Sequence, residues 1–183
     1  MSSAVALVTV PARQRAVADA AVGLTSITVA ALLVASEAAA AAATLLAWTT
    51  FVAAAALVDV RTARLPDLVV LPGVLVTLVG AVASVRITPA LLGSLTLGAP
   101  LLLGHSLRPE GLGFGDVKFG FLVGAGLGVM AFSSVVVAYL LSVVLHVALC
   151  AAVRAGRRAV PFGPALSVAA FLTMSLNIVG RFS

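Results

Sequence analysis

Long apolar stretches follow one another along this chain, and its few charged residues fall mainly between them. A helix needs roughly 20 apolar residues to cross about 30 Å of hydrocarbon. Seven such stretches can be laid along the sequence, at about 16–36, 38–59, 68–85, 88–105, 117–132, 133–153 and 165–180. The pattern predicts an all-α polytopic membrane helix bundle of about seven transmembrane helices, in a single domain covering residues 1–183.

Two parts of this pattern allow a second interpretation. The fifth and sixth are joined only by Phe132, Ser133 and Ser134, and together they far exceed one crossing, so a helical hairpin is expected there. Basic residues precede the first stretch, as in a signal peptide, but that stretch is long and shows no clear small-residue cleavage site. It is interpreted as a retained helix.

The composition supports a membrane protein and narrows its chemistry. Hydrophobic residues make up 62% of the chain and charged residues only 9%, beyond the range of ordinary soluble domains. Eleven bases against six acids give a net charge of +5, but the bases sit at the ends of apolar runs, so no nucleic-acid partner is expected. A single cysteine, Cys150, excludes an internal disulfide and a four-cysteine zinc site.

Lysine and arginine are distributed unevenly between the connections, which predicts the orientation. With the N-terminus in the cytoplasm, Arg86 and Arg181 fall on the far side. The cytoplasmic side then holds nine bases: Arg13, Arg15, Arg61, Arg64, Arg108, Lys118, Arg154, Arg157 and Arg158. This arrangement puts Asp59 and Asp116 at the cytoplasmic ends of the second and fifth stretches, where they can share one site.

Asp59 and Asp116 need an explanation, because a charge inside the bilayer costs roughly 2.5 to 3.5 kcal/mol on insertion scales. Asp59 could mark the water boundary and pair with Arg61 or Arg64, and Asp116 could be the N-cap of the fifth helix. Two acids at one end of the bundle instead favour a carboxylate pair that shares a proton. One member would activate water while the other protonates a scissile amide, as in an aspartic protease.

Helix polarity makes the two acids unequal. Asp59 follows a helix, where the macrodipole disfavours negative charge, whereas Asp116 opens one, where it favours it. Asp116 is therefore expected to activate water and Asp59 to donate the proton. His105 and His146 are too far apart to suggest a serine or cysteine nucleophile system. His146 is expected to be a packed residue, and His105 could support the loop before Asp116.

Glycines surround the second acid in the stretch GLGFGDVKFG, at 111–120. Gly111, Gly113 and Gly115 lack Cβ atoms and could let an extended peptide approach the acid, or could simply make the loop flexible. Lys118 is expected to anchor the helix at the lipid headgroups. The spacing of these glycines and the aspartate is by itself weak evidence for a catalytic site. The presence of the second acid strengthens it.

Two prolines enclose Phe162 and Gly163 in the stretch VPFGPAL, at 160–166. Pro161 and Pro164 predict a rigid turn before the last helix. Phe162 and Gly163 could either form that turn alone or line a substrate groove beside the aspartates.

These two stretches and LVDVRTARLPDLVVLP, at 57–72, occur in the order of the signature regions of the type IV prepilin peptidase family, and the chain resembles its compact, peptidase-only members. The resemblance implies an aspartic endopeptidase of the cytoplasmic membrane that needs no metal or cofactor. It matches Asp59 and Asp116 to the catalytic aspartates, and Gly113 and Gly115 to the glycines of the GxGD signature. The implied substrate is a prepilin or pseudopilin, whose short basic leader is removed after a glycine at the cytoplasmic face.

The chain departs from that family in two respects. Larger members carry a cysteine-containing domain and methylate the new N-terminus, whereas the one cysteine here lies in an apolar stretch, so methylation is not expected. Asp67 occupies a position where the family often has asparagine, and it is interpreted as the N-cap of the third helix.

Other functions fit parts of the pattern. Pro164, Ala165 and Leu166 also resemble the PAL signature of presenilin-like proteases, whose substrate is a transmembrane helix. A small transporter or assembly scaffold could use acids to bind a cation or proton, but it would place them deep within spans or in inverted repeats. Gly120, Gly124 and Gly128 form a small-residue face that is expected to pack internally. The sequence does not fix an oligomeric state.

Overall fold

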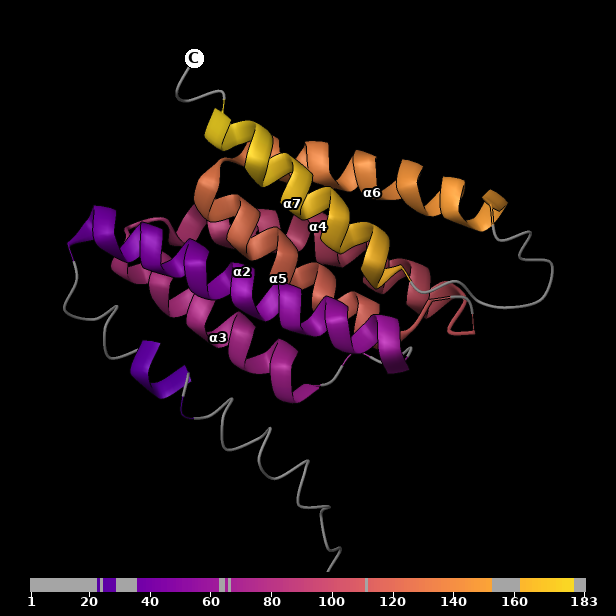
Figure 1. Cartoon of the computed structure of the whole chain (residues 1–183), viewed down its shortest axis with the longest axis horizontal. Coiled ribbons are helices and arrows are strands. Elements are labelled where there is room, and N and C mark those ends of the chain that lie inside the picture. Colours follow the sequence, from indigo (N-terminus) through magenta and orange to yellow (C-terminus); the bar gives the residue numbers. More distant parts are fainter. Residues whose placement is uncertain are drawn as a thin grey trace, which may run out of the picture.

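The computed structural model describes residues 23, 25–28, 36–62, 65, 67–110, 112–152 and 162–179. Their six long helices (Figure 1) are α2 (Glu37–Thr62), α3 (Asp67–Ala83), α4 (Ile87–Leu107), α5 (Phe114–Met130), α6 (Phe132–Ala152) and α7 (Gly163–Val179). Residues 25–28 are helical too, and no strand occurs in the part described. The prediction of an all-α bundle is confirmed, while most of the first expected stretch, 16–36, falls outside the described residues.

The lengths of the helices suit a membrane. Among the described segments, α2, α4 and α6 are each long and apolar enough to cross a bilayer, and α3 is a shorter apolar helix. Many large apolar side chains are exposed, among them Leu95 at 55% and Val144 at 63%. Such a surface is stable against lipid rather than water, so the chain forms a membrane helix bundle.

The expected break between the fifth and sixth stretches is present. α5 ends at Met130 and α6 begins at Phe132, and Ala131 between them is extended, with φ −166° and ψ 140°. α6 then runs back along the bundle (Figure 1). The helical hairpin is confirmed, and its turn is a single residue.

α5 is the central helix and contacts all five of the other long helices (Figure 1). Most of its side chains are buried, and the indole N–H of Trp48 on α2 donates to the Leu122 carbonyl oxygen at 2.9 Å. Its glycine face packs against α4, because a Cβ on Gly124 would collide with the Gly93 carbonyl oxygen. The expected internal packing of this face is confirmed, and it lets the two helix backbones approach closely.

We expect the Gly93→Ala variant to be less stable than the wild-type protein by about 1–3 kcal/mol, the usual cost of overpacking. The added methyl group would overlap the Gly124 carbonyl oxygen, which belongs to a backbone that cannot move aside. Gly104→Ala on the same helix is the control, since its Cβ would meet nothing closer than Leu112 Cδ2 at 3.6 Å. Thermal unfolding in detergent measures both variants, and equal midpoints would contradict the close packing.

Candidate active site

Asp59 lies in the last turns of α2, with only 3% of its surface exposed. Its Oδ2 atom is buried and has no hydrogen-bond partner among the described residues. The side chains of Arg61 and Arg64, its suggested partners, fall outside the described part. A buried polar atom without a partner typically costs about 1–3 kcal/mol, so this oxygen is positioned at an energetic cost.

Asp116 is the third residue of α5 and is also buried. The N-cap of α5 is Gly113, and no side chain caps the helix, so the interpretation of Asp116 as the N-cap is wrong. α5 begins earlier than expected, and the carboxylate is directed elsewhere. Its Oδ1 atom accepts a hydrogen bond from the backbone N–H of Gly163 at 3.1 Å.

Gly163, the first residue of α7, brings the two acids together. A Cβ atom on this glycine would lie 2.5 Å from Asp59 Oδ2 and 3.5 Å from Asp116 Oδ1. Both oxygens therefore lie close to one point. The distance between them falls within the roughly 6 Å that two hydrogen bonds through a single water can span. The sequence expectation that Asp59 and Asp116 share one end of the bundle agrees with this geometry.

Only part of the turn expected from the two prolines is described, because Gly163 and Pro164 already belong to α7. Pro164 lies in the first turn of α7, where its missing N–H has no helical partner to lose; Pro161 falls outside the described residues. Phe162 is 6% exposed, and its ring meets the edge of the His146 ring at a centroid distance of 5.1 Å. His146 thus occupies the packed position expected of it and supports the turn from α6.

His105 contacts and stabilises the loop before Asp116. The His105 Nδ1 atom is 2.7 Å from the Leu112 carbonyl oxygen, and its ring lies 5.4 Å from that of Phe114. A Cβ on Gly113 would only touch Asp116 Oδ2 at 3.6 Å, whereas one on Gly115 would crowd Leu65 Cβ at 3.1 Å. Gly113 therefore leaves space beside Asp116. The missing Cβ of Gly115 instead lets Leu65 of the same chain pack against α5. Gly111 falls outside the described residues.

Lys118 and Asp67 form an ion pair that was not predicted from the sequence. The Lys118 ammonium contacts both carboxylate oxygens of Asp67, at 2.7 and 2.9 Å, and lies 4.8 Å from the centre of the Phe114 ring. The pair joins the first turn of α3 to α5. Asp67 binds Lys118 in place of the expected N-cap role, and the pair neutralises its charge.

In the described part of the chain, no group of three or more His, Cys, Asp or Glu side chains is arranged to hold a metal ion. Around Gly163, the two aspartate carboxylates converge with the Gly163 amide.

Comparison with known proteins gives one family match. Neither the curated proteins nor the solved structures include a match to the chain. The model of the type IV leader peptidase family matches residues 44–153, more than half of the sequence. The matched segment includes Asp59 and Asp116 and ends before Gly163. The chain therefore belongs to the type IV leader peptidase family.

Proposed function

We propose that this membrane peptidase is an aspartic endopeptidase that removes the short basic leader of type IV prepilin or pseudopilin precursors. Its site would face the cytoplasm, at the inner side of the cytoplasmic membrane, with the N-terminus on that side. The observation that carries the proposal is the approach of Asp59 and Asp116 to one point beside Gly163. The family supplies the substrate class, a protein with a leader peptide.

In the proposed reaction, a water molecule lies between the two acids. The Asp116 carboxylate accepts a proton from this water as its oxygen attacks the carbonyl carbon of the scissile peptide. Asp59 gives its proton to the amide nitrogen as the carbon–nitrogen bond breaks. The products are the leader, with a new carboxyl terminus, and the mature protein, with a new amine.

Helix polarity supports this division of roles, in opposition to the burial and the neighbouring Asp59 charge, which raise the pKa of Asp116 to about 6. Asp116 lies in the first turn of α5 and accepts the N–H at the start of α7, so the positive ends of two helices favour its charged form. Asp59 lies near the end of α2, and its Oδ2 has no described donor, which favours the neutral form that can donate a proton. At an exposed site, each helix terminus stabilises a nearby opposite charge by about 0.3–1 kcal/mol.

The neighbouring residues would act by support. Phe162 and Gly163 hold the start of α7 against the pair, and Gly113 leaves space for the peptide beside Asp116. Gly115 and Lys118 fix the start of α5, through Leu65 and Asp67 respectively.

The test is cleavage of a prepilin by the purified protein in liposomes. We expect the leader to be lost, with mass spectrometry showing a cut after the glycine that precedes the hydrophobic helix. A precursor in which this glycine is replaced by a bulky residue is the control and should remain intact. A cut within the hydrophobic helix would indicate presenilin-like proteolysis, and an uncut precursor with folded protein would contradict the proposal.

A further inference from the structure

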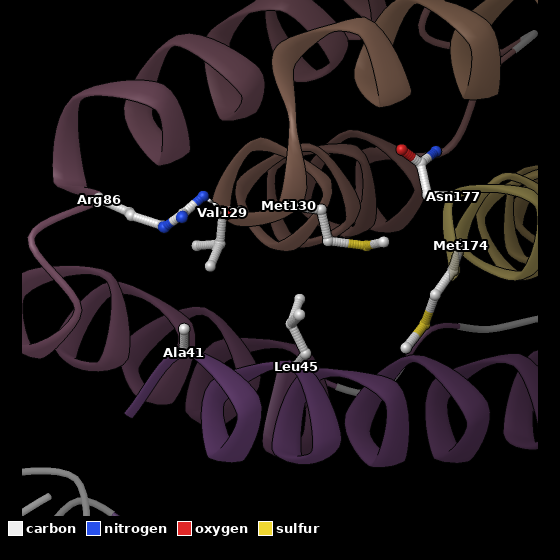
Figure 2. A pocket seen from close by; sticks show the side chains of 7 residues that line it. All are labelled: Ala41, Leu45, Arg86, Val129, Met130, Met174 and Asn177. Atoms are coloured by element: carbon white, nitrogen blue, oxygen red, sulfur yellow. Dashed lines mark hydrogen bonds between the residues drawn. The ribbon is translucent and has the colours of Figure 1, made fainter. Parts of the chain in front are cut away.

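A second polar feature lies at the other end of the bundle, in a cavity of about 130 Å³. Figure 2 shows the side chains that line it, from α2, α5, α7 and the connection between α3 and α4. They are Ala41, Leu45, Arg86, Val129, Met130, Met174 and Asn177.

The position of this cavity follows from the direction of the helices. α2 carries Ala41 near its start and Asp59 near its end, while α5 and α7 run the opposite way, from Asp116 to Met130 and from Gly163 to Asn177. The cavity and the aspartates are therefore at opposite ends of the same three helices. In a bundle that crosses the bilayer, the cavity therefore lies toward the membrane interface opposite the aspartates.

Arg86 gives the cavity an unneutralised positive charge. Its Nη1 atom donates to the Val129 carbonyl oxygen at 3.1 Å, at the last turn of α5. A guanidinium has five N–H donors, so further donors remain, and no acid pairs with Arg86 among the residues described. The Arg86 backbone N–H is bound by the Ala81 carbonyl oxygen at 2.7 Å, which fixes the base of the side chain at the rim.

Asn177 adds an acceptor, and the remaining walls are apolar. The Asn177 amide group donates to the Thr173 carbonyl oxygen at 3.0 Å, which leaves its Oδ1 atom to accept a hydrogen bond. Leu45, Met130 and Met174 project into the space between (Figure 2). Methionine side chains are flexible and adapt to irregular apolar ligands.

We propose that this cavity binds one anionic phospholipid with a hydroxyl-bearing headgroup, of the phosphatidylglycerol type. The phosphate accepts hydrogen bonds from the Arg86 guanidinium, whose planar donors match phosphate oxygens. A headgroup hydroxyl donates to Asn177 Oδ1, and the first part of one acyl chain contacts Leu45 and the two methionines. A choline headgroup offers no such hydroxyl and brings a positive charge towards Arg86, so it fits less well.

Native mass spectrometry of the full chain in detergent tests this proposal with phosphatidylglycerol and phosphatidylcholine as probes. We expect one phosphatidylglycerol to be retained more tightly than phosphatidylcholine, since phosphatidylcholine lacks the hydroxyl that donates to Asn177 and brings a choline charge towards Arg86. Arg86→Gln should weaken phosphatidylglycerol binding at least about tenfold, because the phosphate loses its hydrogen bonds to a charged group. Arg108→Gln, an exposed arginine at the end of the aspartates, is the matched control and should preserve it.

A second variant separates lipid binding from the contact between Arg86 and Val129. Leu45→Trp fills the cavity but keeps the arginine, and it should also lose the bound lipid. Retention of phosphatidylglycerol by both variants would overturn the proposal, as would its complete displacement by millimolar inorganic phosphate, which would indicate a site for the ion alone. Neither side chain approaches the aspartates, so prepilin cleavage reports separately on the peptidase.

Discussion

Replacing Asp59 or Asp116 with asparagine is expected to lower the rate of prepilin cleavage by roughly 10²- to 10⁴-fold, the contribution typical of acid–base groups. Without Asp116 the water has no base, and without Asp59 the leaving nitrogen has no proton donor. Because the two carboxylates act as a unit, the double variant should be little slower than either single variant. Initial rates at saturating substrate in liposomes, with helix content checked by circular dichroism, give the measurement.

Asp67→Asn provides the matched control at the same end of the bundle. Its carboxylate binds Lys118 at a site where its side chain is 56% exposed, and exposed ion pairs contribute only about 0–1 kcal/mol. Its cleavage rate should therefore stay within about fivefold of wild type. An equal loss in Asp67→Asn, or full activity in Asp59→Asn, would show that the buried pair is not the source of catalysis.

The helices could be predicted from the sequence because crossing hydrocarbon imposes both a length and an apolar composition. The observed helix ends differ from the predicted ones by a few residues where the helix continues past the apolar stretch. α2 was expected to end at Asp59 and continues to Thr62, so Asp59 lies inside the helix with its side chain among neighbouring helices. Apolar patterns report the membrane boundary, whereas the helix end depends on local backbone hydrogen bonds.

The shared end of the two aspartates could also be predicted, since two predicted spans lie between them and return the chain to the same side. The wrong N-cap role of Asp116 arose because α5 starts with Phe114 and Gly115, residues that carry no strong helix-start signal. The pairing of Lys118 with Asp67 could not be predicted, because it depends on how α3 docks beside α5.

The contact of Gly163 with both acids depends likewise on the docking of α7. The sequence marked Gly163 only as part of a proline-bounded turn, with a groove-lining role left open. In the structure it supplies a donor to one acid and lacks a side chain where the other acid lies.

The Gly163→Ala variant is expected to reduce the turnover rate of the proposed reaction by roughly 10- to 100-fold. The new Cβ would lie 2.5 Å from Asp59 Oδ2, so either the carboxylate or the start of α7 must shift. A shift of α7 weakens the N–H donation to Asp116, and a hydrogen bond to a charged group contributes about 1.5–3 kcal/mol, which corresponds to that range of rates.

A pH profile separates positioning from a loss of folding. The Gly163 N–H favours the charged form of Asp116, so weakening it should move the acidic limb of kcat/KM to higher pH, since the base must be ionised to act. Ser167→Ala is the control within α7: it removes the hydroxyl bond to the Gly163 carbonyl oxygen, at 2.8 Å, without adding an atom beside the acids. Its acidic limb should match that of wild type. If Gly163→Ala lowers only the unfolding temperature and leaves the limb and turnover unchanged, the amide of Gly163 does not position Asp116 for catalysis.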